Sequence, residues 1–291
     1  MPSERQRTAL DHLFVIGQGL LPQHLLSRAL GKLAASEIGW LKNLLINAFI
    51  RHYGVDLGEA ELQSPAAYAS FNAFFSRALK PQARPLEDNP AAVASPVDGT
   101  VSQLGRLQHE RIIQAKGHDY GLLELLGGDP ELARYFVDGD FVTLYLSPRD
   151  YHRIHMPVAG TLKAMIYVPG RLYSVNPATT ERLPGLFTRN ERVICLFDTT
   201  SGPMAMVLVG AMIVASIETV WAGLVTLPRR QLHRWRYDQG PIELARGQEM
   251  ARFLLGSTVI LLFGPNQLRW SAELQPGTPL RMGETVANMQ K

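Results

Sequence analysis

The sequence has little cysteine and no long apolar run. One cysteine among 291 residues cannot form an internal disulfide. Cys195 lies in an apolar strand pattern, so we expect a buried structural thiol and a reducing, cytosolic environment. No uncharged apolar run reaches the ~18 residues that a membrane-spanning helix needs. The first residues also lack the apolar stretch and small-residue cleavage site of a signal peptide.

Charge is sparse as well, with charged residues at 19% and a formal net charge of +3. Residues 1–51 contain six basic and three acidic residues, so this segment accounts for the whole positive excess. Such a mild bias is not typical of nucleic-acid-binding proteins, and we expect no nucleic-acid partner. The hydrophobic content of 46% is ordinary for a folded chain with a sizeable core.

The N-terminal region is predicted to be helical. Leucines at helical spacing over residues 9–35 indicate amphipathic helices, broken near residues 17–19 and Pro22, and a second helix is predicted over residues 36–53. Two interpretations remain open for these helices. They either pack on the core or form a basic amphipathic segment that is attracted to anionic lipid.

The remaining sequence is dominated by short β-like runs that follow a predicted helix at residues 71–79 and a proline-rich connector at residues 80–85. One helical insertion is predicted at residues 121–136, and a peripheral strand and loop with a disordered end from Gln275 onward. We therefore predict an α+β fold with a boundary near residue 80. The predicted strands cover residues 101–107, 141–146, 160–168, 192–197, 204–208, 212–220 and 254–263.

A buried strand is predicted across residues 251–264, interrupted by Gly256, Ser257 and Thr258. Ordinarily such an interruption is a bulge whose serine binds backbone. A reactive alternative exists because Gly256 lacks a Cβ and the Ser257 hydroxyl lies near the preceding carbonyl carbon. With a base and oxyanion donors, an N-to-O acyl shift would convert this amide into an ester. β-Elimination and loss of ammonia would then leave a pyruvoyl group.

Three polar residues upstream could support such chemistry. Asp98 is predicted in a turn before a strand, where an aspartate usually binds local backbone. His152 and His155 are predicted in a loop or short turn between Pro148 and Pro157. A zinc pair is disfavoured because no third ligand stands at suitable spacing, so we expect no metal.

Several motifs together resemble one known family. Val-Asp-Gly (residues 97–99), Tyr-His-Arg-Ile-His-Met-Pro (151–157) and Leu-Gly-Ser-Thr (255–258) are similar to stretches of the bacterial, membrane-associated phosphatidylserine decarboxylases. The resemblance extends roughly from residue 40 to residue 265. Further matching stretches are residues 114–118, 145–151, 189–192 and 216–223.

This resemblance implies a proenzyme that cuts itself between Gly256 and Ser257, giving a β chain of residues 1–256 and an α chain of residues 257–291. Asp98, His155 and Ser257 would act as a charge relay for cleavage, and His152 would assist decarboxylation. A covalent pyruvate (pyruvoyl) group made from Ser257 would be the cofactor. It would form a Schiff base with phosphatidylserine, from which CO₂ and phosphatidylethanolamine are released.

The resemblance also implies a location and partners. Residues 1–80 would associate peripherally with the cytoplasmic face of the cell membrane, and residues 81–291 would form the β-rich catalytic domain. The β and α chains would remain associated, and a homo-oligomer is possible. Arg149, Arg189 and Arg192 are candidate ligands for the lipid phosphate.

Two alternatives come from other classes of protein. A serine hydrolase could use Asp98, His155 and Ser257, although the sequence around Ser257 lacks the G-x-S-x-G turn that exposes such a nucleophile. A non-catalytic lipid-binding or carrier module is the other alternative, because residues 95–101 and 160–163 resemble hairpins of biotinyl and lipoyl carriers. Lys163 departs from the usual carrier motif.

Overall fold

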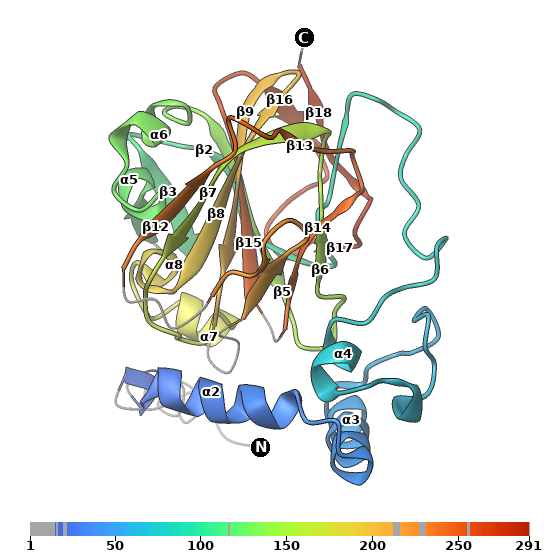
Figure 1. The fold of residues 1–291 in the computed structure, drawn as a ribbon. Helices are drawn as coiled ribbons and strands as arrows, with labels where there is room; N and C mark the ends of the chain where they lie inside the picture. The colour runs from blue at the N-terminus through green and yellow to red at the C-terminus, as the bar shows by residue number, and fades with distance from the viewer. Residues whose placement is uncertain are drawn as a thin grey trace.

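The computed structural model describes residues 15, 17–19, 22–115, 117–211, 216–226, 231–254 and 257–290. The N-terminal helices gather at one end of the molecule (Figure 1). Within the described residues, no helix is long and apolar enough to cross a membrane. These N-terminal elements are α2 (Gln23–Ala34), α3 (Gly39–Tyr53), the 3-10 turn η1 (Pro65–Ala67) and α4 (Phe71–Phe75).

The predicted helix over residues 36–53 is confirmed as α3. It ends where Gly54 adopts a left-handed conformation with a φ of 66°. Residues 17–19 are helical, and the predicted break is seen at Pro22, the residue directly before α2. The side chain of Ser70 caps α4, which ends at Phe75 and is shorter than predicted. Most of the predicted helical region before residue 22 lies outside the described residues.

A large antiparallel sheet forms the body of the molecule (Figure 1). Its inner strands are rich in branched and aromatic residues, which favour a pleated, buried surface. In spatial order the strands are β12 (His233–Arg236), β7 (Gly160–Val168), β8 (Arg192–Thr199), β9 (Gly202–Val209), β15 (Ser257–Phe263), β5 (Asp140–Leu146), β2 (Gly99–Arg106) and β17 (Pro279–Leu280), with β13 (Ile242–Leu244) also paired to β7.

Smaller elements cover the two faces of this sheet. Two small sheets lie on one face, and short helices with a hairpin lie on the other. The small sheets are β11 (Gly223–Leu224), β10 (Ile217–Thr219), β14 (Glu249–Phe253) and β6 (Arg153–His155), and β1 (Ala92–Ala94), β18 (Thr285–Met289) and β16 (Leu268–Trp270). The opposite face carries β3 (Arg111–Ala115), β4 (His118–Gly121), α5 (Leu122–Leu125), α6 (Pro130–Arg134), α7 (Pro177–Thr180) and α8 (Leu186–Arg189).

The hydrophobic core has two layers because the large sheet is buried on both faces. Side chains alternate along a strand, so β15 contributes to both layers. Val259, Leu261 and Phe263 pack in the layer shared with the small sheets. Ile260 and Leu262 pack in the layer under the short helices. The predicted α+β, β-rich fold is confirmed.

Strand predictions are most accurate for the inner strands, and residues 160–168 form β7 with the predicted bounds. The predicted insertion at 121–136 divides into α5 and α6 because Gly127 and Gly128 adopt φ values of 77° and 80°. The C-terminal region is less peripheral than predicted, since it supplies β17 and β18, and Val286 of β18 is fully buried. Of the predicted strand 212–220, only β10 is seen, and residues 212–215 lie outside the described part.

The predicted single strand over residues 251–264 is wrong. It is two strands in different sheets, with β14 paired to β6 and β10, and β15 paired to β5 and β9. Ser257 is therefore the first residue of β15 and not a residue in the middle of a strand. The apolar runs on either side of residues 254–256 are each buried, but in separate sheets, which the pattern of hydrophobicity cannot reveal.

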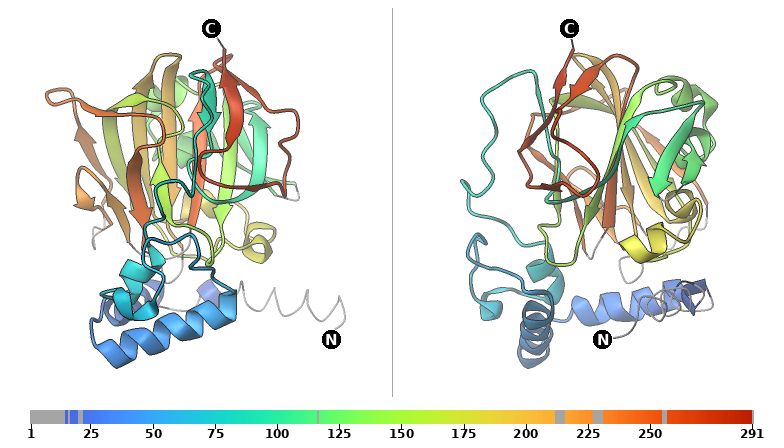
Figure 2. Two further views of the ribbon diagram at one scale, coloured as in Figure 1. Left: turned by 90° about the vertical axis from the view of Figure 1, so that its right-hand side faces the viewer. Right: turned by 180° about the vertical axis from the view of Figure 1, so that it is seen from behind.

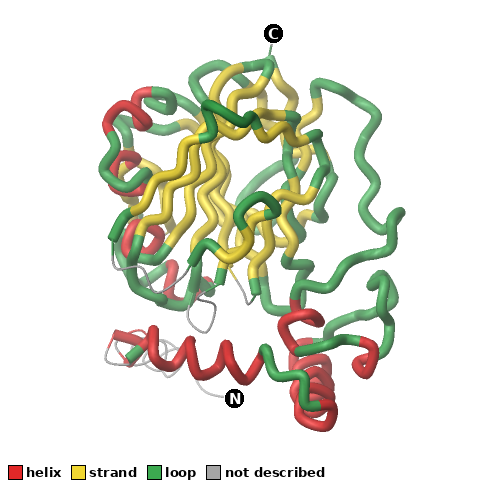
Figure 3. The backbone as a smooth tube through the Cα atoms, viewed as in Figure 1, coloured by secondary structure: helices red, strands yellow, loops and turns green. Residues whose placement is uncertain are grey.

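We call residues 22–79 the helical unit. It has a hydrophobic core of its own. Phe49 of α3 packs edge-to-face on Phe74 and Phe75 of α4, with ring centroids 6.0 and 5.7 Å apart. Figures 2 and 3 show this unit at the end of the body opposite β16 and β18. The division into domains at residue 80 stays a prediction.

Candidate active site

Ser257 is fully buried where the chain passes from one sheet to another. It lies opposite Leu146 of β5 in the ladder. Its Oγ has no hydrogen-bond partner among the described residues. A buried hydroxyl without a partner is destabilising, so it calls for an explanation by chemistry rather than by stability. The preceding Gly256 lies outside the described residues.

His152 is another buried polar residue with an atom that has no partner among the described residues. It lies directly before β6, and its carbonyl oxygen accepts the amide of Phe253 at 3.0 Å, which ties it to the strand preceding the predicted cleavage site. Its Nδ1 donates to the Asp150 carbonyl at 2.8 Å. Nε2 is buried without a partner among the described residues. The ring packs against Phe75, with centroids 4.1 Å apart.

Burial keeps His152 neutral. Loss of hydration lowers its pKa to about 3, and the backbone carbonyl of Asp150 opposes this shift only in part. Because a carbonyl oxygen can only accept, Nδ1 carries the proton and Nε2 presents a lone pair. His152 is therefore equipped to accept a proton or a hydrogen bond at Nε2.

His155 ends the short strand β6, where a loop was predicted. Pairing of β6 with β14 overrides the loop signal of the flanking prolines, which only limit the strand to three residues. Nδ1 of His155 donates to the Gly247 carbonyl at 2.8 Å, and Nε2 accepts from the Tyr151 hydroxyl at 2.9 Å. Burial raises the pKa of Tyr151, so this hydroxyl keeps its proton.

Burial also lowers the pKa of His155, while the bond to Gly247 and the nearby carboxylates oppose the shift. The resting ring is thus a neutral imidazole with its Nε2 lone pair directed at Tyr151. The carbonyl of Gly247 accepts from Nδ1 and so fixes the tautomer of His155. The resemblance would give this role to Asp98. Sequence reasoning missed Gly247, and Tyr151 was quoted only as part of a motif.

Asp98 lies in the predicted turn, at the residue before β2, and is largely buried. Its Oδ1 accepts from Arg84 Nε and the Met282 amide, each at 2.8 Å, and its Oδ2 accepts from Arg84 Nη2 at 2.5 Å. The described residues contain no hydrogen bond between Asp98 and His155. The two are nevertheless close, because the His155 amide donates to the Pro96 carbonyl at 2.9 Å.

The structure therefore joins Asp98 and His155 by proximity and charge, not by a direct bond. The carboxylate of Asp98 is one of the groups that raise the pKa of His155. Arg84, the actual partner of Asp98, stands in the proline-rich connector, where the sequence offered no sign of this ion pair.

The three arginines predicted as candidate phosphate ligands differ in burial and in hydrogen bonding. Arg192 is buried and donates to four backbone carbonyls, so its guanidinium is used in the structure. Arg149 and Arg189 are exposed. No group of three or more potential metal-ligating side chains occurs in the described part of the chain.

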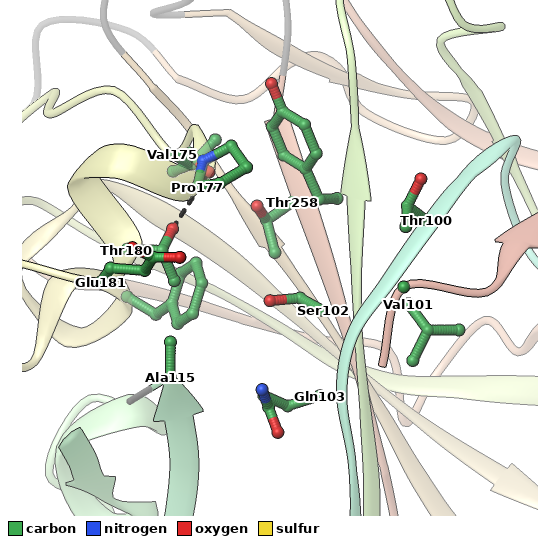
Figure 4. Close-up of a pocket in the computed structure, with 13 residues that line it drawn as sticks. Thr100, Val101, Ser102, Gln103, Ala115, Val175, Pro177, Thr180, Glu181 and Thr258 are labelled. Carbon is green, nitrogen blue, oxygen red and sulfur yellow. Dashed lines mark hydrogen bonds between the residues drawn. The ribbon is translucent and has the colours of Figure 1, made fainter. Parts of the chain in front are cut away.

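A pocket of about 310 Å³ lies beside β15, the strand that begins with Ser257 (Figure 4). Thr258 and Tyr145 line it from β15 and β5, and Thr180 and Glu181 line it from the region of α7. Because neighbouring residues of a strand face opposite ways, the Ser257 side chain points to the other side of the sheet. The pocket is therefore separated from Oγ of Ser257 by the backbone of β15.

Comparisons with known proteins place the chain in a family. A family model described as "Phosphatidylserine decarboxylase" matches residues 71–288, and one described as "PSD" matches residues 13–54. Three curated relatives are each named "Phosphatidylserine decarboxylase proenzyme". That of Ectopseudomonas mendocina is 60% identical over 283 residues, covering 96% of this chain and 99% of the relative.

The relative from Azotobacter vinelandii is 61% identical over 279 residues, covering 95% of this chain and 98% of its own length. The relative from Pseudomonas fluorescens is 61% identical over 275 residues, covering 94% of this chain and 96% of its own length. These matches span both the helical unit and the β-rich body. The chain therefore belongs to the phosphatidylserine decarboxylase family.

Proposed function

We propose that this decarboxylase is made as a proenzyme, cleaves itself between Gly256 and Ser257, and converts phosphatidylserine to phosphatidylethanolamine and CO₂. The observation that carries the proposal is the buried Ser257 hydroxyl without a described partner, at the junction between two sheets in a chain of this family. The names of the relatives, each a proenzyme, support processing of the chain.

Self-cleavage would use the chain's own atoms. Oγ of Ser257 attacks the Gly256 carbonyl carbon, the C–N bond breaks, and an ester forms as the nitrogen takes a proton. Loss of the Ser257 α-proton then expels the Gly256 carboxylate. Hydrolysis of the resulting N-terminus releases ammonia and completes the smaller chain.

His155 is the proposed base for Ser257. Its Nδ1–H bond to Gly247 leaves the Nε2 lone pair as the only proton acceptor on the ring. This lone pair is engaged by Tyr151, so proton transfer from Ser257 requires exchange of that bond or passage through the tyrosine hydroxyl. Asp98 would stabilise the imidazolium through its charge.

The residues around Ser257 fit a small covalent carbonyl group, because the side chain is enclosed and the unused hydroxyl has no other structural role. A pyruvoyl group there would supply an electrophilic ketone for the substrate amine and a sink for the electrons left by CO₂. His152 is tied to the same region, and its Nε2 has no partner among the described residues, so this lone pair would accept a proton or a hydrogen bond beside the reacting carbon.

The helical unit supports peripheral contact with a membrane at the cytoplasmic face. Helix α2 buries the polar side chains of Gln23 and Ser27 and exposes Leu25. Gln23 accepts the Leu172 amide at 2.9 Å, so α2 contacts the body through polar bonds. This is the reverse of an ordinary surface helix, and among the described residues its apolar side chains Leu25 and Leu33 are exposed, as a lipid-facing side would be.

Denaturing mass spectrometry tests the proposed cleavage. The wild-type protein should give chains of residues 1–256 and 257–291, whereas Ser257→Ala should remain one chain and release no CO₂ from phosphatidylserine. Thr258→Ala is the matched control, because this neighbouring hydroxyl faces the other side of the sheet, and it should still be cut. An active wild-type chain that stays whole would contradict the proposal, and fluorophosphonate labelling of Ser257 would favour a hydrolase.

Mass spectrometry, together with an assay of CO₂ release, also distinguishes the proposed roles of His155 and His152. His155→Ala should block cleavage because it removes the proposed base. His152→Ala should be cut normally and lose decarboxylation. If the His152→Ala chain stays whole, the two roles are assigned wrongly.

A further inference from the structure

Arg77 is a buried cation with unused donors beside the candidate active site. Its exposed fraction is 5%. Nη2 donates to the carbonyl oxygens of Arg149 at 2.9 Å and Asp150 at 3.4 Å. Nε and Nη1 are buried without a hydrogen-bond partner among the described residues. Two of the three guanidinium nitrogens thus have no hydrogen-bond partner among the described residues.

The nearby carboxylates do not satisfy this cation. Asp98 and Asp150 are close enough to stabilise its charge. However, both oxygens of Asp98 accept from Arg84, and Oδ2 of Asp150 accepts the Ser147 amide at 2.7 Å. The described residues contain no ion pair of Arg77. A buried charge without an ionic partner is costly, and such groups concentrate at functional sites.

Two contacts place Arg77 next to His152. The Asp150 carbonyl that accepts from Arg77 also accepts Nδ1 of His152 at 2.8 Å. Phe75, two residues before Arg77, packs on the His152 ring with centroids 4.1 Å apart. The guanidinium and the imidazole therefore converge on one carbonyl, at the seam between the helical unit and the body.

We propose that Arg77 binds the phosphodiester group of the substrate through one of its unused donors, Nε–H or Nη1–H. The inference rests on the proposed function. Nε–H pairs with Nη2–H in a fork, as in the bond of Arg84 to Asp98, and Nη2 of Arg77 is already bonded. Each unused N–H can therefore give one charge-assisted hydrogen bond to a phosphate oxygen. In phosphatidylserine the phosphorus lies three bonds from the carbon that loses CO₂. When this carbon lies beside His152, the phosphate therefore lies near Arg77.

The phosphate is a better ligand here than the substrate's carboxylate. The phosphodiester keeps its charge throughout the reaction, so Arg77 can hold it equally in the ground state and the transition state. The carboxylate becomes neutral CO₂, and a strong bond to a buried cation would stabilise the ground state and slow the loss of CO₂. Arg77 is thus a substrate-binding residue that fixes the headgroup beside His152.

Water-soluble amines test this assignment on the processed enzyme. Glycerophosphoserine carries the phosphodiester, whereas O-methylserine lacks it and retains the amine and carboxylate. Capture of each amine on the smaller chain with cyanoborohydride is measured by mass spectrometry. The wild type should favour glycerophosphoserine roughly 10- to 100-fold, as expected for charge-assisted hydrogen bonds. Arg77→Met should bring this ratio close to one, and Arg77→Lys should give an intermediate ratio.

Arg134→Met is the matched control, because it removes an arginine of α6 whose side chain is 74% exposed, and it should keep the wild-type ratio. Misfolding or lost cleavage would lower capture of both amines and leave the ratio informative. An unchanged ratio in Arg77→Met overturns the proposal. Arg77→Met could also lose capture of glycerophosphoserine and O-methylserine equally and still capture glycerophosphoethanolamine. Arg77 would then bind the substrate's carboxylate, which would also overturn the proposal.

A second readout needs no reaction. Glycerophosphoglycerol has a phosphodiester and no amine, so its ³¹P line width reports binding alone. Processed wild-type enzyme should broaden the line, and processed Arg77→Met should not. If wild-type protein is never cleaved, the proposed function has failed. If it is cleaved and active but both enzymes broaden the line equally, only the role of Arg77 has failed.

Discussion

Three residues of the proposed chemistry, Arg77, His152 and Ser257, have buried polar atoms without partners among the described residues. Arg192 is as buried as Arg77, yet it donates to four carbonyls, whereas Arg77 leaves two nitrogens unused among the described residues. The same contrast sets His152, with a bare Nε2, apart from His155, whose two ring nitrogens are both bonded. Such atoms reduce stability, so at Arg77 and His152, which share the Asp150 carbonyl, they are consistent with a role in function.

Glu191 is a buried carboxyl outside this cluster that makes stability depend on pH. Tyr167 donates to it at 2.7 Å, and burial raises its pKa from an ordinary value of 4.5 to about 7. Folding therefore favours the protonated form. Its stabilising effect is complete below about pH 4.5 and is lost as the pH rises to about 7. The loss should be on the order of 3 kcal/mol.

Replacing Glu191 by Gln should remove this dependence. In a Ser257→Ala background, which keeps one chain, urea unfolding at pH 5 and pH 8 gives the free energy of unfolding. The parent should lose stability at pH 8 and Glu191→Gln should lose much less. The control Glu131→Gln changes a carboxylate that is 75% exposed and should behave like the parent. Equal losses in all three proteins would show that Glu191 ionises normally when folded.

The identities of the candidate site residues were accessible from sequence, but most of their bonds were not. The motifs around residues 98, 152, 155 and 257 pointed to chemistry because together they resemble stretches of one known family. The partners are distant in sequence, as Gly247 is 92 residues from His155 and Arg84 is 14 residues from Asp98. Arg77 was missed altogether, because an arginine after a short helix reads as a surface residue unless its burial is known.

Among the secondary-structure elements, local sequence predicted type better than pairing. The strand β7 and the helix α3 were foreseen because their hydrophobic periods are long and regular. The change of sheet between β14 and β15 was not predicted, because both strands are apolar and buried and their sequences do not show which sheet each joins. The three-residue β6 could not be predicted either, because it is a strand only through pairing with β14.

The proposed membrane contact can be tested at the exposed side chains of α2 and α3. Trp40 is 71% exposed and Leu44 is 60% exposed, and both lie on α3 at the helical end of the molecule. Insertion of such side chains into the lipid interface removes apolar surface from water. The variant Trp40→Ser with Leu44→Ser should bind vesicles of phosphatidylglycerol and phosphatidylserine at least about tenfold more weakly. Co-sedimentation measures this partitioning.

The control for this experiment is Ile113→Ser, which removes an apolar side chain that is 48% exposed on β3, away from the helical unit. It should bind vesicles like the wild type. All variants should still be cleaved, because none contacts the candidate active site. Equal partitioning of the double variant and the wild type would exclude α3 from the membrane contact.

At the scale of the whole molecule, the proposed cut would divide the chain at the centre of its largest sheet. The smaller chain would begin with β15, which lies between β9 and β5. It would also carry β17, paired to β2, and β18, paired to β1. Every one of these partner strands belongs to the larger chain. Cleavage therefore breaks one covalent bond and leaves the sheet ladders and both core layers intact.

We accordingly expect the two chains to remain together after cleavage. All seven residues of β15 are buried, so separation would expose a complete central strand and unpair both its edges. Native mass spectrometry of the processed protein should give a species close to 32.3 kDa, and urea should be needed to release the smaller chain. The uncut Ser257→Ala protein provides the reference mass under both conditions. Spontaneous release of the smaller chain in native buffer would contradict this account of the fold.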